Sequence, residues 1–174
     1  MSPVTKLNDL ISFKTAEHLP FFSTKVDTYL KWLPLGSVLI LDAFNVDTRD
    51  DVKEQLLIRG CAVGLLAAIV QPLKKVTHEF RPNLTGKENS FPSSHTAMSF
   101  LGAEMLHQEL KDNYPIASYL GYGASTATGV LRILKNKHWL TDVLAGAALG
   151  ILVGKGVYAL AKKLKKQPQP LKGL

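Results

Sequence analysis

The segment GAALGILVG, residues 146–154, spaces Gly146, Gly150 and Gly154 four residues apart in an apolar run, and it predicts a closely packed helix. Residues four apart share one face of a helix. A stripe of small residues on that face lets helix backbones approach closely, as they do between membrane-spanning helices. The segment GCAVG, residues 60–64, repeats this spacing. A tightly packed soluble bundle uses the same device, so the rest of the chain must decide between the two.

Five apolar segments run through the chain, at 32–46, 56–77, 94–110, 115–134 and 139–161. The breaks between them are rich in charge or contain Pro and Gly, and none of the segments shows the two-residue alternation of a strand. Residues 113–131 carry no charge over about the length that a membrane span needs. Trp32 and Trp139 stand at segment ends, where an interfacial aromatic belt would place them. The sequence therefore predicts an all-α integral membrane bundle of about five to six helices.

The two ends of the chain differ from this apolar middle. Leu7, Leu10 and Ile11 have helical spacing, which predicts an amphipathic helix lying on a bilayer or packed on the body of the protein. We expect an N-terminal helical region over 1–31, a bundle over 32–162 and a basic tail over 163–174. A composition with 46% hydrophobic residues excludes a disordered chain.

Cations and a proline follow the second apolar segment, in KKVTHEFRP from Lys74 to Pro82. Lys74 and Arg81 are seven residues apart, which is two helical turns, so we expect both on one helix face, with the helix ending at Pro82. A single basic pair also suits an ordinary solvated helix end. Two converging cations equally suit a doubly charged anion.

Two serines and a histidine open the third apolar segment, in FPSSH, residues 91–95. Ser93 is a good N-cap, and the free backbone N–H groups of a helix start, here around Ser93 and Ser94, form a ready anion site. His95 lies in that first turn. Capping explains the serines without explaining the imidazole beside them.

A third group lies in RILKNKHWLTD, residues 132–142, which contains Arg132, His138 and Asp142. His138 and Asp142 are four apart and would stack on one face if the last helix has begun. A carboxylate that accepts one ring N–H frees the other ring nitrogen as nucleophile or base. A surface histidine near a helix-start aspartate is the ordinary alternative. In an up-and-down bundle, however, all three groups fall at the same end.

With these residues in order, the chain resembles the type 2 phosphatidic acid phosphatase superfamily, which also contains bacterial acid phosphatases and vanadium haloperoxidases. The resemblance rests on Lys-x6-Arg-Pro, Pro-Ser-x-His and Arg-x5-His-x3-Asp, and it covers most of the chain. Two positions depart from the family pattern: Ser94 replaces the usual Gly, and Leu131 replaces the usual Ser. We expect activity to survive both changes, because neither alters a histidine.

The resemblance implies the following roles. His138 would attack phosphorus and form a phosphohistidine, Asp142 would hold its imidazole, and His95 would protonate the leaving oxygen and then activate water. The phosphoryl oxygens would be held by Lys74, Arg81, Ser93, Ser94 and Arg132. The substrate would be a phosphorylated lipid: an isoprenyl phosphate or diphosphate, phosphatidic acid, phosphatidylglycerophosphate or a lipid A type. We expect no metal, no cofactor and no nucleic-acid partner.

Two other functions remain open at this stage. A soluble acid phosphatase of the same superfamily suits the modest mean hydropathy of +0.07, and a non-catalytic lipid-phosphate binder or transporter could use the same cationic pocket. For location, we expect a multi-pass protein of the bacterial inner membrane. The end opposite the motifs carries an excess of Lys and Arg, namely Arg49, Lys53, Arg59, Lys111 and five tail lysines. This excess predicts a cytoplasmic tail and a site on the outer face.

Overall fold

A computed structural model describes residues 2–43, 52–83 and 85–165. These residues form seven helices and no strand. The helices are α1 Pro3–His18, α2 Val26–Leu30, α3 Leu33–Ala43, α4 Val52–Thr77, α5 Ser94–Leu110, α6 Pro115–Leu134 and α7 Leu140–Lys165. The predicted all-α fold is confirmed. Residues 44–46 of the first predicted segment, and the basic tail from residue 166 on, lie outside the described residues.

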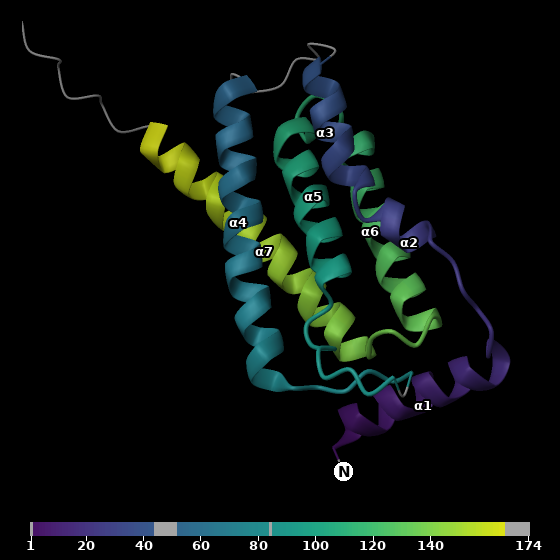
Figure 1. Cartoon of the computed structure of the whole chain (residues 1–174). Helices are drawn as coiled ribbons and strands as arrows, with labels where there is room; N and C mark the ends of the chain where they lie inside the picture. Colours follow the sequence, from purple (N-terminus) through teal and green to yellow (C-terminus); the bar gives the residue numbers. More distant parts are fainter. Residues whose placement is uncertain (1, 44–51, 84, 166–174) are drawn as a thin grey trace, which may run out of the picture.

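Helix α5 is the centre of the bundle. It contacts α3, α4, α6 and α7, and its contacts with α7 and α6 are the most extensive. Figure 1 shows α5 enclosed by these helices, with α1 lying across the end where α5 and α7 begin. Its buried side chains include Leu101 and Met105, which no solvent reaches. The helix thus carries the core on which the other elements pack.

The glycine stripe that opened the sequence analysis is the contact surface between α7 and α5. A Cβ atom on Gly146 would stand 2.6 Å from the Ser93 carbonyl oxygen, and one on Gly150 would stand 2.4 Å from that of Ala97. Only glycine permits so close a backbone approach. Gly60 and Gly64 have no such neighbour within 4 Å, so reading their spacing as a second packing stripe was wrong. The four-residue spacing of glycines shows that one helix face carries small residues, and only the fold shows whether another helix packs on that face.

We predict that Gly150→Ala destabilises the bundle by about 1–3 kcal/mol, the usual cost of overpacking a tight contact. Thermal unfolding in detergent would measure the loss as a lower midpoint. Gly156→Ala is the matched control, because nothing lies within 4 Å of its added methyl group and alanine favours a helix over glycine. Equal midpoints for the two variants would contradict this packing.

The polarity of the bundle is that of a protein in lipid. Leu57, Leu120 and Leu152 point outward and are 67%, 69% and 66% exposed, whereas Arg59 and Glu109 are buried between helices. The Arg59 guanidinium donates to both carboxylate oxygens of Glu109, at 3.1 and 2.7 Å. Charges that face the interior and pair there, with leucines outside, are what a bilayer selects.

Two helices, Lys53–Thr77 and Leu140–Lys165, are long and apolar enough to cross a membrane by length and composition. The charge-free segment 113–131 is not among the candidates found in the described residues. Its serines, threonines and glycines lower the hydropathy without adding charge, so the absence of charge alone was not enough to identify a membrane span.

Helix α1 confirms the predicted N-terminal helix and packs on the bundle. It contacts α6 and α7, and the Asn8 side-chain amide donates a hydrogen bond to the Thr141 hydroxyl at 2.8 Å. Leu7, Leu10 and Phe13 remain largely exposed. The helix thus combines a polar attachment to the bundle with an outward apolar surface of the kind that lies at a lipid interface.

Candidate active site

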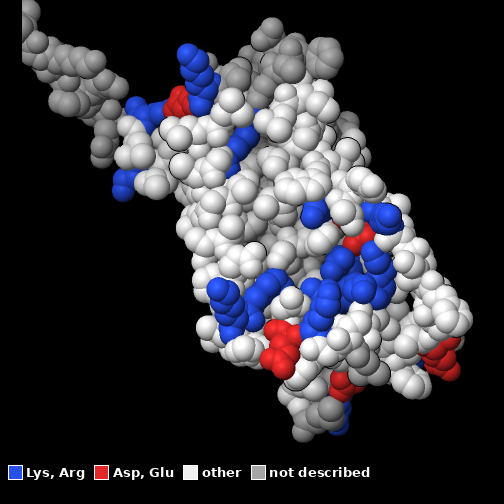
Figure 2. Space-filling view, viewed as in Figure 1, with Lys and Arg blue, Asp and Glu red and all other residues white. Residues whose placement is uncertain are grey.

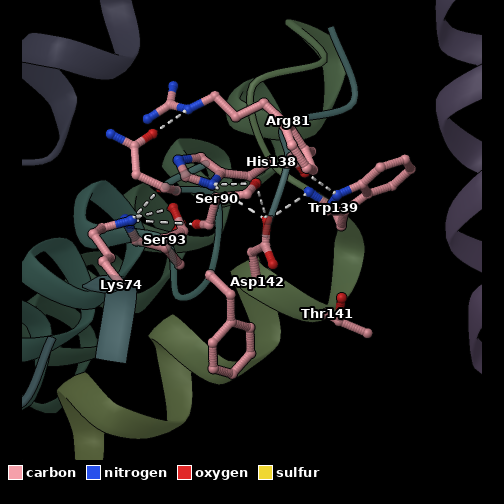
Figure 3. A network of polar contacts seen from close by, with 12 residues as sticks. Lys74, Arg81, Ser90, Ser93, His138, Trp139, Thr141 and Asp142 are labelled. Atoms are coloured by element: carbon pink, nitrogen blue, oxygen red, sulfur yellow. Dashed lines mark hydrogen bonds and ion pairs between the residues drawn. The ribbon is translucent and has the colours of Figure 1, made fainter. Parts of the chain in front are cut away.

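The three groups of motif residues meet at the end of the bundle that α1 crosses, as the up-and-down arrangement predicted. The ends of α4 and α6 and the starts of α5 and α7 lie there (Figure 1). Figure 2 shows Lys and Arg side chains gathered over the same end. Figure 3 shows Lys74, Arg81, Ser93, His138 and Asp142 directed into one polar network.

His138 and Asp142 form the buried centre of this network. His138 is 3% exposed and Asp142 is fully buried, and the His138 Nδ1 atom lies 3.4 Å from Asp142 Oδ2. Helix α7 begins only at Leu140, so the condition for the two residues to stack on one helix face is not met, although they are in contact. A loop places the imidazole above the first turn of α7. This arrangement leaves the His138 Nε2 atom available for chemistry.

The Asp142 carboxylate is itself held by two donors. The Ser90 hydroxyl donates to Asp142 Oδ2 at 2.6 Å and the Trp139 backbone N–H donates to it at 2.9 Å (Figure 3). The Ser90 oxygen also lies 3.5 Å from His138 Nδ1. Sequence reasoning missed Ser90, a buried residue just before FPSSH, because a loop serine carries no periodic or motif signal. It acts through Asp142 as a positioning residue.

Burial sets the protonation of His138. Burial lowers the pKa of His138 to about 4; the hydrogen bond that His138 donates to Asp142 raises the pKa but does not compensate, and the Arg132 charge lowers it further. At neutral pH the imidazole is therefore uncharged, which is the form that a nucleophile needs.

The start of α5 has the predicted cap. The Ser93 hydroxyl accepts from the Thr96 N–H at 3.5 Å, and the Ser93 N–H donates to the Asp142 carbonyl oxygen at 3.0 Å. The N–H groups of Ser94 and His95 have no acceptor among the described residues. They are the free donors of the helix start and suit an anion.

Lys74 and Arg81 reach the site from different backbone segments. Helix α4 ends at Thr77, and His78 has a positive φ of 46°, a left-handed conformation that terminates helices. The prediction that both cations share one helix face was therefore wrong. Lys74 Nζ donates to the Asn89 carbonyl oxygen at 2.7 Å, and Arg81 Nε donates to the Asn89 side-chain oxygen at 2.9 Å. The α4–α5 connection thus brings the two cations together.

Arg132 is held by a carboxylate that sequence reasoning missed. An Arg132 guanidinium N–H donates to Asp27 Oδ2 at 2.9 Å, and Lys135 Nζ donates to Asp27 Oδ1 at 2.7 Å. Burial alone would raise the pKa of Asp27, but the hydrogen bonds from Lys135 and Arg132 hold it below its usual value. A single aspartate, 105 residues from its partner, gave no sequence signal.

Lys31 is the second missed contributor from the N-terminal region. Its Nζ atom lies 3.5 Å from His95 Nε2, and it stands 5.0 Å from the centre of the Trp32 ring. Lys31 and Asp27 are four residues apart, and both reach the site from α2 and its C-terminal end. Helix α2 is therefore part of the site, although no motif marks it.

The described residues contain no group of three or more His, Cys, Asp or Glu side chains that could hold a metal ion. Asp142 is committed to Ser90, Trp139 and His138. The charge available to a substrate is instead that of fixed Lys and Arg side chains, which stabilise a phosphoryl group by electrostatics.

Fold and site together define a class: a membrane helical bundle with a buried His–Asp pair, a second histidine and fixed cations at one end. The chain belongs to the PAP2 superfamily, whose model matches residues 55–166. This agrees with the family expected from the three motifs.

One relative and two solved structures extend the comparison. The chain is 34% identical over 148 residues to a lipid A 1-phosphatase of Porphyromonas gingivalis, covering 84% of this chain but 33% of that protein, so it spans about one third of the relative's length. A transmembrane PAP2 type phosphatidylglycerolphosphate phosphatase from Bacillus subtilis superposes with a TM-score of 0.66 at 21% identity, covering 97% of this chain and 90% of that chain. LpxE from Aquifex aeolicus gives 0.64 at 23% identity, covering 91% and 96%. Both share the fold.

Proposed function

We propose that this chain is a membrane phosphatase that removes phosphate from a phosphorylated lipid through a phosphohistidine intermediate. The observation that carries the proposal is the buried His138, held by Asp142 and uncharged at neutral pH, at the end of the bundle that also holds His95 and the cations. The relative is a lipid A 1-phosphatase, one structural neighbour is a phosphatidylglycerolphosphate phosphatase and the other is LpxE, and these three names support the proposal.

The first step is attack on phosphorus by His138. Its Nδ1 side faces Asp142, so the Nε2 lone pair forms the bond to phosphorus while the bond from phosphorus to the lipid oxygen breaks. Asp142 stabilises the positive charge that develops on the imidazole. Ser90 and the Trp139 N–H keep the carboxylate in place, so little reorganisation is needed during the reaction.

His95 handles the protons of both steps. His95 takes up a proton together with the anionic substrate, whose charge favours the imidazolium form. It donates this proton to the departing lipid oxygen and then accepts one from the water that cleaves the phosphorus–nitrogen bond. That hydrolysis releases inorganic phosphate and regenerates His138. The half-buried position of His95 at the first turn of α5 leaves it open to the substrate.

The phosphoryl oxygens lie among Lys74, Arg81, Arg132 and the free N–H groups of Ser94 and His95. Phosphoryl transfer depends mostly on positioning and charge stabilisation, and each cation is already fixed by a partner, Asn89 or Asp27. The Ser94 side chain is half-buried at this cradle, and we propose that it narrows the cradle without removing a donor.

For location, we propose the bacterial inner membrane with the site on the outer face. Lys53, Lys111, Lys162, Lys163 and Lys165 lie at the opposite end, and by the positive-inside rule they favour a cytoplasmic position there. Arg59, which belonged to the predicted charge excess, is buried against Glu109 and does not count toward it. Arg49 lies outside the described residues, and α1 and α2 bring Lys6, Lys14, Lys25 and Lys31 to the site end. The charge count of the described residues therefore does not favour one orientation, and the outer-face position stays a prediction.

The test is a phosphate-release panel in detergent over diacyl, isoprenyl and soluble phosphates, each with and without EDTA. We expect turnover of at least one lipid phosphate that EDTA leaves unchanged, because the site uses fixed cations. Exclusive turnover of soluble phosphates, with a monodisperse protein obtained without detergent, would indicate the acid phosphatase. Tight binding without turnover would indicate a lipid-phosphate binder.

A further inference from the structure

Lys31 belongs to a side of the site that the proposed mechanism has not yet used. Helix α2 contacts α5, α6 and α3, whereas α4, which carries Lys74, contacts α5 and α7. Figure 1 shows α2 and α4 on opposite sides of α5. Two sets of cations therefore approach the start of α5 from different directions, and Lys31 is the one beside His95.

The position of His95 indicates which of these two sides faces the transferred phosphoryl group and which faces the leaving group. On the side of Lys74 and Arg81 lies His138, which bonds to the transferred phosphoryl group. Because His95 protonates the leaving oxygen, Lys31, 3.5 Å from the His95 Nε2 atom, lies beside the leaving group. A neutral leaving group, such as the hydroxyl of a diacylglycerol, gives a cation there nothing to pair with.

The backbone holds Lys31 in this position. Asp27, one helical turn before it, is fully buried and bound to Arg132 and Lys135, so the α2 backbone is anchored at the site. Burial and the nearby Arg132 charge both lower the pKa of Lys31, and Asp27 opposes them only in part. Burial is the larger cause, so a bound anion would stabilise an ammonium group that has lost part of its hydration.

An apolar groove lies close to Lys31, because Leu33, two residues further along the sequence, belongs to its lining. It has a volume of about 440 Å³ and lies between α3, α5 and α6. Its lining includes Leu33, Pro34, Ile40, Leu106 and Leu120. A molecule whose phosphoryl group is at His138 would pass His95, then Lys31, and then enter this groove with its hydrocarbon part.

From this order we infer that Lys31 binds the inner phosphoryl group of a lipid diphosphate while the outer phosphoryl group reacts at His138. The inference rests on the proposed function. The His138 Nε2 atom forms a bond to the outer phosphorus, and the bond from that phosphorus to the bridging oxygen breaks. The electron pair stays on the bridging oxygen, which takes the proton of His95. The product is a lipid monophosphate, whose negative charge Lys31 stabilises.

The experiment compares an isoprenyl diphosphate with the isoprenyl monophosphate of the same chain length in detergent. We expect Lys31→Gln to lower the ratio of kcat/KM for the diphosphate to that for the monophosphate by about 10-fold to 100-fold, the range for a lost hydrogen bond to a charged group. Lys31→Arg keeps the charge and should retain most of the ratio. Lys25→Gln, an exposed lysine at the start of α2, should leave both rates unchanged.

Each other outcome is informative. An equal loss on both substrates, or an unchanged ratio in Lys31→Gln, overturns the assignment of Lys31 to the inner phosphoryl group. Wild-type protein that hydrolyses the monophosphate but not the diphosphate overturns it too, and leaves the proposed function standing. Wild-type protein that releases phosphate from neither substrate, nor from any lipid phosphate of the wider panel, contradicts the proposed function itself.

Discussion

His138→Ala is expected to reduce lipid phosphate hydrolysis by about 10⁴-fold or more, the scale of losing an enzyme nucleophile. The chain offers no substitute: the His95 ring lies beside Lys31, on the leaving-group side, and the Asp142 carboxylate is enclosed by its donors. The cations and helix-start N–H groups would remain, so the variant should still bind substrate. The loss should therefore appear in kcat more than in KM.

A rapid acid- and alkali-quench with ³²P-labelled substrate distinguishes this role from a structural one. The wild-type protein should carry a label that resists alkali and is lost in acid, as a phosphohistidine does, and His138→Ala should carry none. His18→Ala, which removes an exposed histidine at the end of α1, is the matched control and should keep full activity. Full activity of His138→Ala would contradict the mechanism.

The sequence was most informative where local chemistry alone marks an element. Helices α5 and α6 begin and end at the residues that bound the apolar segments 94–110 and 115–134. Ser93 caps one and Pro115 opens the other, so helix signals and apolar runs agree. The gathering of the motifs at one end also followed, because alternating helix directions permit only one such arrangement.

Contacts between distant segments could not be predicted in this way. Asp27 lies in a short helix without a periodic pattern and Lys31 directly follows that helix. Their partners are Arg132 and His95, far along the chain. Residue spacing also could not predict where the helices end: Arg81 follows the end of α4 and His138 precedes α7. In both cases the side chains reach the site through loop geometry, which seven-residue and four-residue spacings do not encode.

Asp27→Asn is expected to cost about 3–5 kcal/mol of stability, the range for removing one partner of a buried ion pair. Asp27 is fully buried and accepts from Arg132 and Lys135 through its two oxygens. An amide would leave two cations without a counter-charge in a region of low polarity. The loss should appear as a lower thermal midpoint in detergent, whereas Glu17→Gln, an exposed carboxylate on α1, should leave the midpoint unchanged.

A second variant separates ion pairing from simple packing. Adding Lys135→Met to Asp27→Asn removes one of the two orphaned charges, so the double variant should be more stable than Asp27→Asn alone. If the stability losses of Asp27→Asn and Lys135→Met merely add in the double variant, the carboxylate acts through packing and not through charge.

The pH dependence of stability gives an independent check. Because the pKa of Asp27 is below its usual value, its contribution is fully present above about pH 4 and is lost as the pH falls through the folded-state pKa. Asp27→Asn should lack that part of the acid sensitivity, since an amide does not titrate.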